Sequence, residues 1–260
     1  MLLTLGDSFS DTRYEGDKPW PEHLAEKMNL LLLNISHSGE SNSFMHRNLI
    51  WACEKHKGEF THVVISLTNW NRYELPLKHY TGLGCKTKTF KPSGVLDVGQ
   101  DDPFWKRIYT KYYNEKFYID EAAALMITAQ NLKKLYGFDL AFIQPILPLK
   151  EKDKYSPSPV YRDQSVYDYI KKESMLQYVD KELFIEYELS ADNILNPGYT
   201  EDPQLWEQFT MFNSQNCMGY HDIDGKGRYI EVFDAHPNQR GHKLICDKIF
   251  KRFNNDNRNS

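Results

Sequence analysis

A serine near one end of the chain and a histidine near the other are of the types that perform nucleophilic catalysis together. Ser8 follows a short apolar run at the start of the chain, and His236 stands just before the last helical segment. A serine hydroxyl is a weak nucleophile, so it needs a base within hydrogen-bond reach and a group that orients the base. We therefore interpret Ser8 as a candidate nucleophile, His236 as its base and Asp234 as the orienting carboxylate.

Acyl transfer also requires hydrogen-bond donors aimed at the oxyanion of the tetrahedral intermediate. The backbone N–H of Ser8 is one candidate. Gly39 lies in a polar turn after the second apolar run, where the missing side chain lets a backbone N–H approach a ligand closely. Asn69 ends the third apolar run and offers a side-chain NH₂ group to the same point.

Apolar runs alternate with helical patterns along much of the chain. The predicted strands span residues 2–5, 30–35, 62–67 and 138–143, and the predicted helices span 19–28, 44–56, 114–136 and 238–253. Buried strands that alternate with helices predict an α/β fold with an open, mostly parallel sheet covered on both faces. The polar turns 6–8, 38–39 and 68–69 all follow strands, at the sheet edge where such folds collect reactive groups.

Two segments interrupt this alternation. Residues 72–112 contain several glycines and prolines without a clean period, and residues 149–230 are irregular except for a predicted helix near 165–180. We expect one domain over residues 1–260 that carries insertions at about 72–112 and 149–230.

Composition excludes several classes of protein. The 260 residues are 40% hydrophobic and 26% charged, and 32 Lys and Arg stand against 36 Asp and Glu. This balance lacks the concentrated positive charge that a nucleic-acid groove needs. No apolar stretch approaches the ~20 residues that span a bilayer, no signal-peptide pattern opens the chain, and the four cysteines form no CxxC pair. We expect a cytoplasmic protein with reduced thiols.

Four blocks of the sequence resemble those of the SGNH (GDSL-type) hydrolases, in that family's order. The first block is Gly6-Asp7-Ser8-Phe9-Ser10-Asp11, and the last is Asp234-Ala235-His236-Pro237-Asn238 with Gly241-His242. Between them, residues 38–42 are similar to the glycine block and residues 67–69 to the asparagine block.

The resemblance implies a flavodoxin-like three-layer α/β/α sandwich and hydrolysis of an ester through an acyl-serine intermediate. It implies that Ser8 is the nucleophile, that His236 is general base and then general acid, and that Asp234 orients it. The oxyanion donors would be the N–H groups of Ser8 and Gly39 and the side chain of Asn69. No metal or organic cofactor is implied.

The sequence departs from the family pattern at two positions. The orienting aspartate usually stands three residues before the histidine, where this chain has Phe233, so Asp224 and Glu231 are alternatives to Asp234. The usual Gly-x-Asn-Asp pattern is replaced by residues 67–70, which leaves Asn71 as an alternative to Asn69 in the oxyanion hole.

The substrate class follows less directly. We expect small acyl esters such as O-acetyl groups on a carbohydrate. The chain has 17 tyrosines, whose apolar rings with hydrogen-bonding tips suit a carbohydrate. The alternatives are a thioesterase or lysophospholipase with the same triad, and an inactive glycan-binding module on the same fold. The Asn-rich tail resembles SGNH proteins of bacteria and their tailed phages, which leaves virion association and the oligomeric state open.

Overall fold

The computed structural model describes part of the chain, including part of each of the two insertions. The described residues are 1–11, 18–37, 40–68, 73–75, 88–90, 114–143, 169, 172–185, 220–222, 229–231, 237 and 239–256. None of the described helices is both long and apolar enough to cross a membrane.

A four-stranded parallel sheet forms the centre of the molecule. Its strands are β1 (Leu2–Leu5), β2 (Leu32–Asn34), β3 (His62–Ser66) and β6 (Asp139–Ile143). They are ordered β2-β1-β3-β6, with Leu2 opposite both Leu32 and His62. Counting only the strands of this sheet, the order is 2-1-3-4, which is the flavodoxin-like order. The predicted parallel sheet is confirmed.

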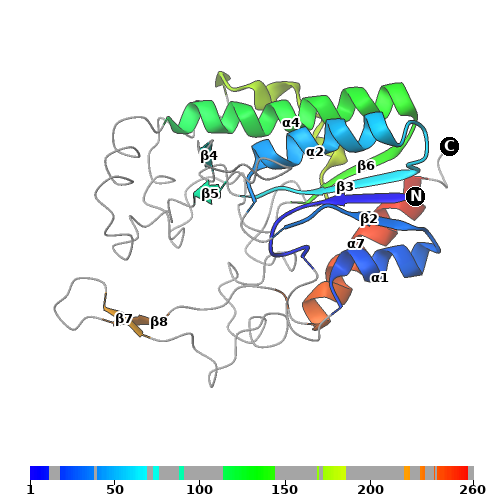
Figure 1. Ribbon diagram of the computed structural model, residues 1–260, viewed down its shortest axis with the longest axis horizontal. Coiled ribbons are helices and arrows are strands. Elements are labelled where there is room, and N and C mark those ends of the chain that lie inside the picture. Colours follow the sequence, from blue (N-terminus) through cyan, green and yellow to red (C-terminus); the bar gives the residue numbers. More distant parts are fainter. Residues whose placement is uncertain are drawn as a thin grey trace, which may run out of the picture.

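Two of the described helices lie on each face of the sheet (Figure 1). One face carries α2 (Asn42–Lys55) and α4 (Glu115–Tyr136), and the other carries α1 (Trp20–Met28) and α7 (Gln239–Asp256). Alternate strand residues enter two separate cores, so that Leu3 packs under α2 and α4 while Leu2 packs under α1 and α7. The three-layer α/β/α architecture is confirmed.

Local signals account for the helix ends that the sequence predicted. The side chain of Asn114 accepts a hydrogen bond from the Phe117 N–H and caps α4, and Gly137 ends that helix with φ of 76°. Ser41 caps α2 in the same way, because its hydroxyl accepts from the Phe44 N–H at 3.1 Å.

The insertions depart from the prediction. The expected helix near 165–180 is wrong in its second half, where the chain forms the 3₁₀ turn η2 (Met175–Tyr178). A second 3₁₀ turn, η3 (Lys181–Leu183), follows it. Ser174 and Asp180 each accept a hydrogen bond from a backbone N–H two residues ahead, and such local bonds compete with a continuous helix. Two antiparallel hairpins also occur that the sequence did not predict, β4 (Tyr73–Leu75) with β5 (Lys88–Phe90) and β7 (Tyr220–Asp222) with β8 (Tyr229–Glu231).

Gly6 ends β1 at a place where no side chain fits. A Cβ atom built on Gly6 would lie 2.5 Å from Ser10 Oγ and 3.0 Å from Ser66 Cβ. Glycine is therefore required here by close approach of the following turn and of β3.

We expect Gly6→Ala to lower the free energy of unfolding by about 1–3 kcal/mol, because the added methyl overpacks the end of β1. Ser10→Ala removes the closest clashing atom, so denaturant unfolding should show favourable coupling between the two substitutions. Gly58→Ala is the control: it is strained by φ of 75° but meets no atom within 4 Å, and it should not couple to Ser10→Ala. Strictly additive effects of Gly6→Ala and Ser10→Ala would contradict this account.

Candidate active site

The topology of the sheet places the candidate nucleophile at its switch point. The chain passes from β1 to β2 on one side and then to β3 on the other, so the order of strands reverses between β1 and β3. In open α/β sheets, ligands bind in the crevice outside the carboxyl ends of the strands at this point. Ser8 follows β1 and Thr68 follows β3, so both lie at this edge.

The carboxylate of Asp7 fixes the turn that carries Ser8. It is fully buried; Oδ1 accepts a hydrogen bond from the Phe9 N–H at 3.0 Å and Oδ2 accepts one from the Thr68 hydroxyl at 2.8 Å. The Asp7 carbonyl accepts a third bond from the Ser10 N–H at 2.9 Å. Ser8, which is 4% exposed, is thus held between anchored neighbours on both sides.

Asn42 joins the start of α2 to the end of β3. Its side-chain Nδ2 donates to the Thr68 carbonyl at 3.0 Å, and its Oδ1 accepts from the Thr68 N–H at 3.1 Å. Both residues are buried, so these two bonds satisfy polar backbone groups that water does not reach. Thr68 is bonded through its N–H, its carbonyl and its hydroxyl.

The second serine of the turn has a structural role. The Ser10 hydroxyl is fully buried and accepts a hydrogen bond from the indole Nε1–H of Trp20 at 3.1 Å. The backbone N–H of Trp20 in turn donates to Nδ1 of His242, a buried residue of α7, at 3.3 Å. The Ser8 turn is therefore tied through Trp20 to the last helix.

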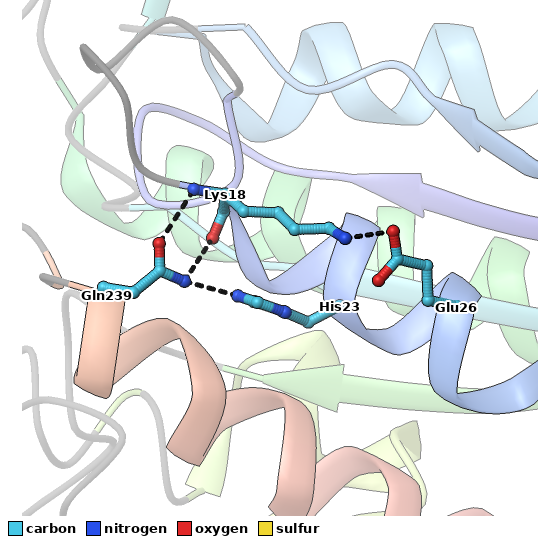
Figure 2. Close-up of polar contacts among 4 residues, drawn as sticks. All are labelled: Lys18, His23, Glu26 and Gln239. Carbon is cyan, nitrogen blue, oxygen red and sulfur yellow. Dashed lines mark hydrogen bonds and ion pairs between the residues drawn. The ribbon is translucent and has the colours of Figure 1, made fainter.

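The first residue of α7 adds a second tie to the segment that precedes α1. Gln239 Oε1 accepts from the Lys18 N–H at 3.0 Å, and Gln239 Nε2 donates to the Lys18 carbonyl at 3.3 Å and to Nε2 of His23 (Figure 2). Burial, followed by the charges of Lys18 and Lys243, lowers the pKa of His23, which keeps its ring neutral and able to accept. The Lys18 ammonium pairs with Glu26 on the outer side of α1.

The cysteines that the structure describes are poor nucleophiles. Cys53 lies in the core under α2 and Cys246 in the core under α7, and both are free thiols. Burial raises the pKa of each thiol to about 11. The reactive thiolate would be scarce near neutral pH, so neither group competes with Ser8 for a nucleophilic role.

Of the predicted site residues, Ser8 lies within the described part of the chain. Gly39, Asn69 and its alternative Asn71 lie outside the described residues, as do Asp234, its alternative Asp224, and His236. Glu231 is described for its backbone, as the last residue of β8. Pro237, which follows His236, is described and buried.

Sequence analysis missed the residues that support the turn: Asp7, Asn42 and Thr68. Asp7 and Asn42 stand inside the first block and the glycine block, which was the signal available for them. Their hydrogen-bond partners could not be predicted from the sequence, because they depend on the parallel pairing that places the end of β1 beside the end of β3.

No protein-family model and no curated protein matches the sequence. Among solved structures, the chain is similar to the psychrotrophic esterase EstA from Pseudoalteromonas sp., with 16% identity, a TM-score of 0.47, and coverage of 98% of this chain and 96% of that chain. It is also similar to Axe2, an acetylxylan esterase from Geobacillus stearothermophilus, with 14% identity and a TM-score of 0.43. That match covers 96% of this chain and 92% of Axe2. A third similar structure is a protein of the G-D-S-L family from Desulfitobacterium hafniense, with 12% identity and a TM-score of 0.40. That match covers 96% of this chain and 98% of the other chain.

Proposed function

We propose that the protein is a serine ester hydrolase of the SGNH type that acts on small acyl esters, such as O-acetyl groups of a carbohydrate. The observation that carries the proposal is the Ser8 turn at the switch point of a parallel sheet, held by the buried Asp7 carboxylate. A nucleophile needs such a fixed position, because productive attack depends on close alignment with the carbonyl carbon.

In the proposed reaction, the Ser8 hydroxyl attacks the ester carbonyl while His236 takes its proton. The N–H groups of Ser8 and Gly39 and the side chain of Asn69 stabilise the oxyanion of the tetrahedral intermediate. His236 then gives the proton to the leaving alcohol, and the acyl group remains on Ser8. A water molecule, deprotonated by His236, releases the acid and restores the serine, while Asp234 orients the imidazole throughout.

The ties between α7 and the Ser8 turn support His236 as the base. Trp20 bonds both to Ser10, two residues after Ser8, and to His242 on α7. Gln239 fixes the first turn of the same helix, and three residues of extended chain from there to His236 span at most about 11 Å. The ties from the Ser8 turn through Trp20 to α7 support a base on the segment that precedes this helix.

Removal of the nucleophile or base tests the proposal directly. We expect Ser8→Ala and His236→Ala each to lower kcat for p-nitrophenyl acetate by about 10⁴–10⁶, because the attacking group or its activation is lost. Ser10→Ala is the control from the same turn: it should keep measurable turnover and lose about 1–3 kcal/mol of unfolding free energy, because the buried Trp20 indole N–H loses its acceptor. Full activity of folded Ser8→Ala would reassign Ser8 as a structural residue.

The asparagine of the oxyanion hole can be assigned in the same assay. We expect Asn69→Ala to lower kcat by about 10²–10³, since one donor to the oxyanion is removed, and Asn71→Ala to stay near the wild-type value. Circular dichroism should show both variants folded. The reverse pattern would place Asn71 in the hole instead.

Acyl-chain length tests the substrate class. If the acyl pocket is small, kcat/KM should fall from p-nitrophenyl acetate to butyrate to octanoate, because each methylene beyond the pocket clashes instead of being buried. Chemically acetylated xylo-oligosaccharides, with acetate release followed by NMR, then test for a sugar ester. A rise in kcat/KM toward octanoate would favour a thioesterase or lysophospholipase, and binding of the oligosaccharide without acetate release would indicate a glycan-binding module.

A further inference from the structure

We infer that Thr68 is the positioning residue of the oxyanion hole, an inference that rests on the proposed function. It makes three kinds of hydrogen bond to two other segments of the chain. Its hydroxyl donates to Asp7, its N–H donates to Asn42, and its carbonyl accepts from Asn42. Thr68 is 1% exposed, so water does not substitute for any of these bonds.

The three hydrogen bonds of Thr68 lie just beyond the end of the parallel sheet. β3 ends at Ser66, and the Leu67 N–H donates to the Ile143 carbonyl at 2.8 Å, as a last bond of the parallel ladder. At Thr68 the neighbouring strand β6 is replaced by the side chain of Asn42, which binds both backbone groups of the residue. The peptide unit that leads into Asn69 is thus oriented by a side chain of α2.

Two of the three proposed oxyanion donors directly follow a member of this network, and the third precedes a member in the same turn. Ser8 directly follows Asp7, Asn69 directly follows Thr68, and Gly39 stands three residues before Asn42. The donors come from three different segments of the chain. Thr68 belongs to one of these segments and hydrogen-bonds to Asp7 and Asn42 in the other two. A change at Thr68 should therefore alter the relative positions of the donors, although Thr68 itself contributes no donor to the oxyanion.

Such a role predicts a defect in transition-state binding and not in substrate binding. An oxyanion hole works because its donors are oriented before the charge develops. A displacement of about 1 Å can lower the rate by about 10²-fold while the ground-state complex is little changed. A residue that only stabilises the fold would change the unfolding midpoint without this effect.

The experiment compares Thr68→Val and Thr68→Ser in the full-length protein. Thr68→Val keeps the shape and removes the hydroxyl, so kcat for p-nitrophenyl acetate should fall by about 10–100-fold with little change in KM. The inhibition constant of trifluoroacetophenone, which adds the serine oxygen and presents an oxyanion, should rise by a similar factor. Thr68→Ser restores the hydroxyl and should restore both values.

Thr128→Val is the matched control. The Thr128 hydroxyl hydrogen-bonds to Nε2 of His46 at 2.8 Å between α4 and α2, in a partly buried site outside the Asp7–Thr68–Asn42 network. Its loss should change the unfolding midpoint while kcat and the inhibition constant stay at their wild-type values. The control separates the effect of losing any partly buried threonine hydrogen bond from the effect of losing the bond between Thr68 and Asp7.

If Thr68→Val does not fold, Asn42→Asp tests the same positioning role, because Asn42 binds both backbone groups of Thr68. The substitution preserves the shape and the acceptor for the Thr68 N–H, removes the donor to the Thr68 carbonyl, and suits the first turn of α2 electrostatically. The same parallel loss of kcat and inhibitor binding is expected.

The outcomes separate this inference from the proposed function. Hydrolysis that depends on Ser8 but is unchanged in Thr68→Val, or in Asn42→Asp, would overturn the positioning role alone. A loss of kcat in Thr68→Val that leaves the inhibition constant unchanged would also overturn it. Wild-type protein without hydrolysis, or hydrolysis that persists in Ser8→Ala, would overturn both.

Discussion

The hydrogen bond between the Asp7 carboxylate and the Thr68 hydroxyl connects the ends of the two central strands. A carboxylate that is fully buried is costly unless hydrogen-bond donors satisfy it, so its two oxygens constrain both the turn after β1 and the residue after β3. The Ser8 turn has its shape because Phe9 must present its N–H to this carboxylate. The arrangement at the edge of the sheet thus follows from the need to satisfy one buried acidic group.

A second constraint joins the two ends of the chain in the layer formed by α1 and α7. Trp20 is fully buried, and it bonds through its indole to the Ser8 turn and through its backbone to α7. Gln239 adds two bonds to Lys18, so the start of α7 is fixed against the start of α1. Residues that are more than two hundred positions apart in the sequence are thereby brought to the same edge of the sheet as Ser8, which a catalytic serine and histidine at opposite ends of a chain require.

Much of the fold could be predicted because its signals are local. Asn114 and Gly137 mark the ends of α4, and the β-branched run before Thr68 marks β3. The bonds among Asp7, Thr68 and Asn42 could not be predicted, because they depend on which strands are neighbours and in which register, and no periodicity encodes that. The 3₁₀ turn η2 was missed for a different reason: the Leu176 N–H donates to the Ser174 hydroxyl, and such a local bond competes with a continuous helix. Ser8 could be singled out because its position after a strand is itself a local signal, whereas Gly39, Asn69, Asp234 and His236 remain predictions from the sequence.

Covalent labelling by a fluorophosphonate tests the central claim, that Ser8 is an activated nucleophile, most directly. Such a probe phosphonylates an activated serine oxygen with loss of fluoride, and intact-mass measurement followed by tryptic mapping locates the adduct. We predict one adduct on the peptide 1–13, which fragmentation assigns to Ser8 and not to Ser10, and no adduct after Ser8→Ala or heat denaturation. An adduct on Ser10 or on another peptide, or no adduct on protein that hydrolyses esters, would contradict it.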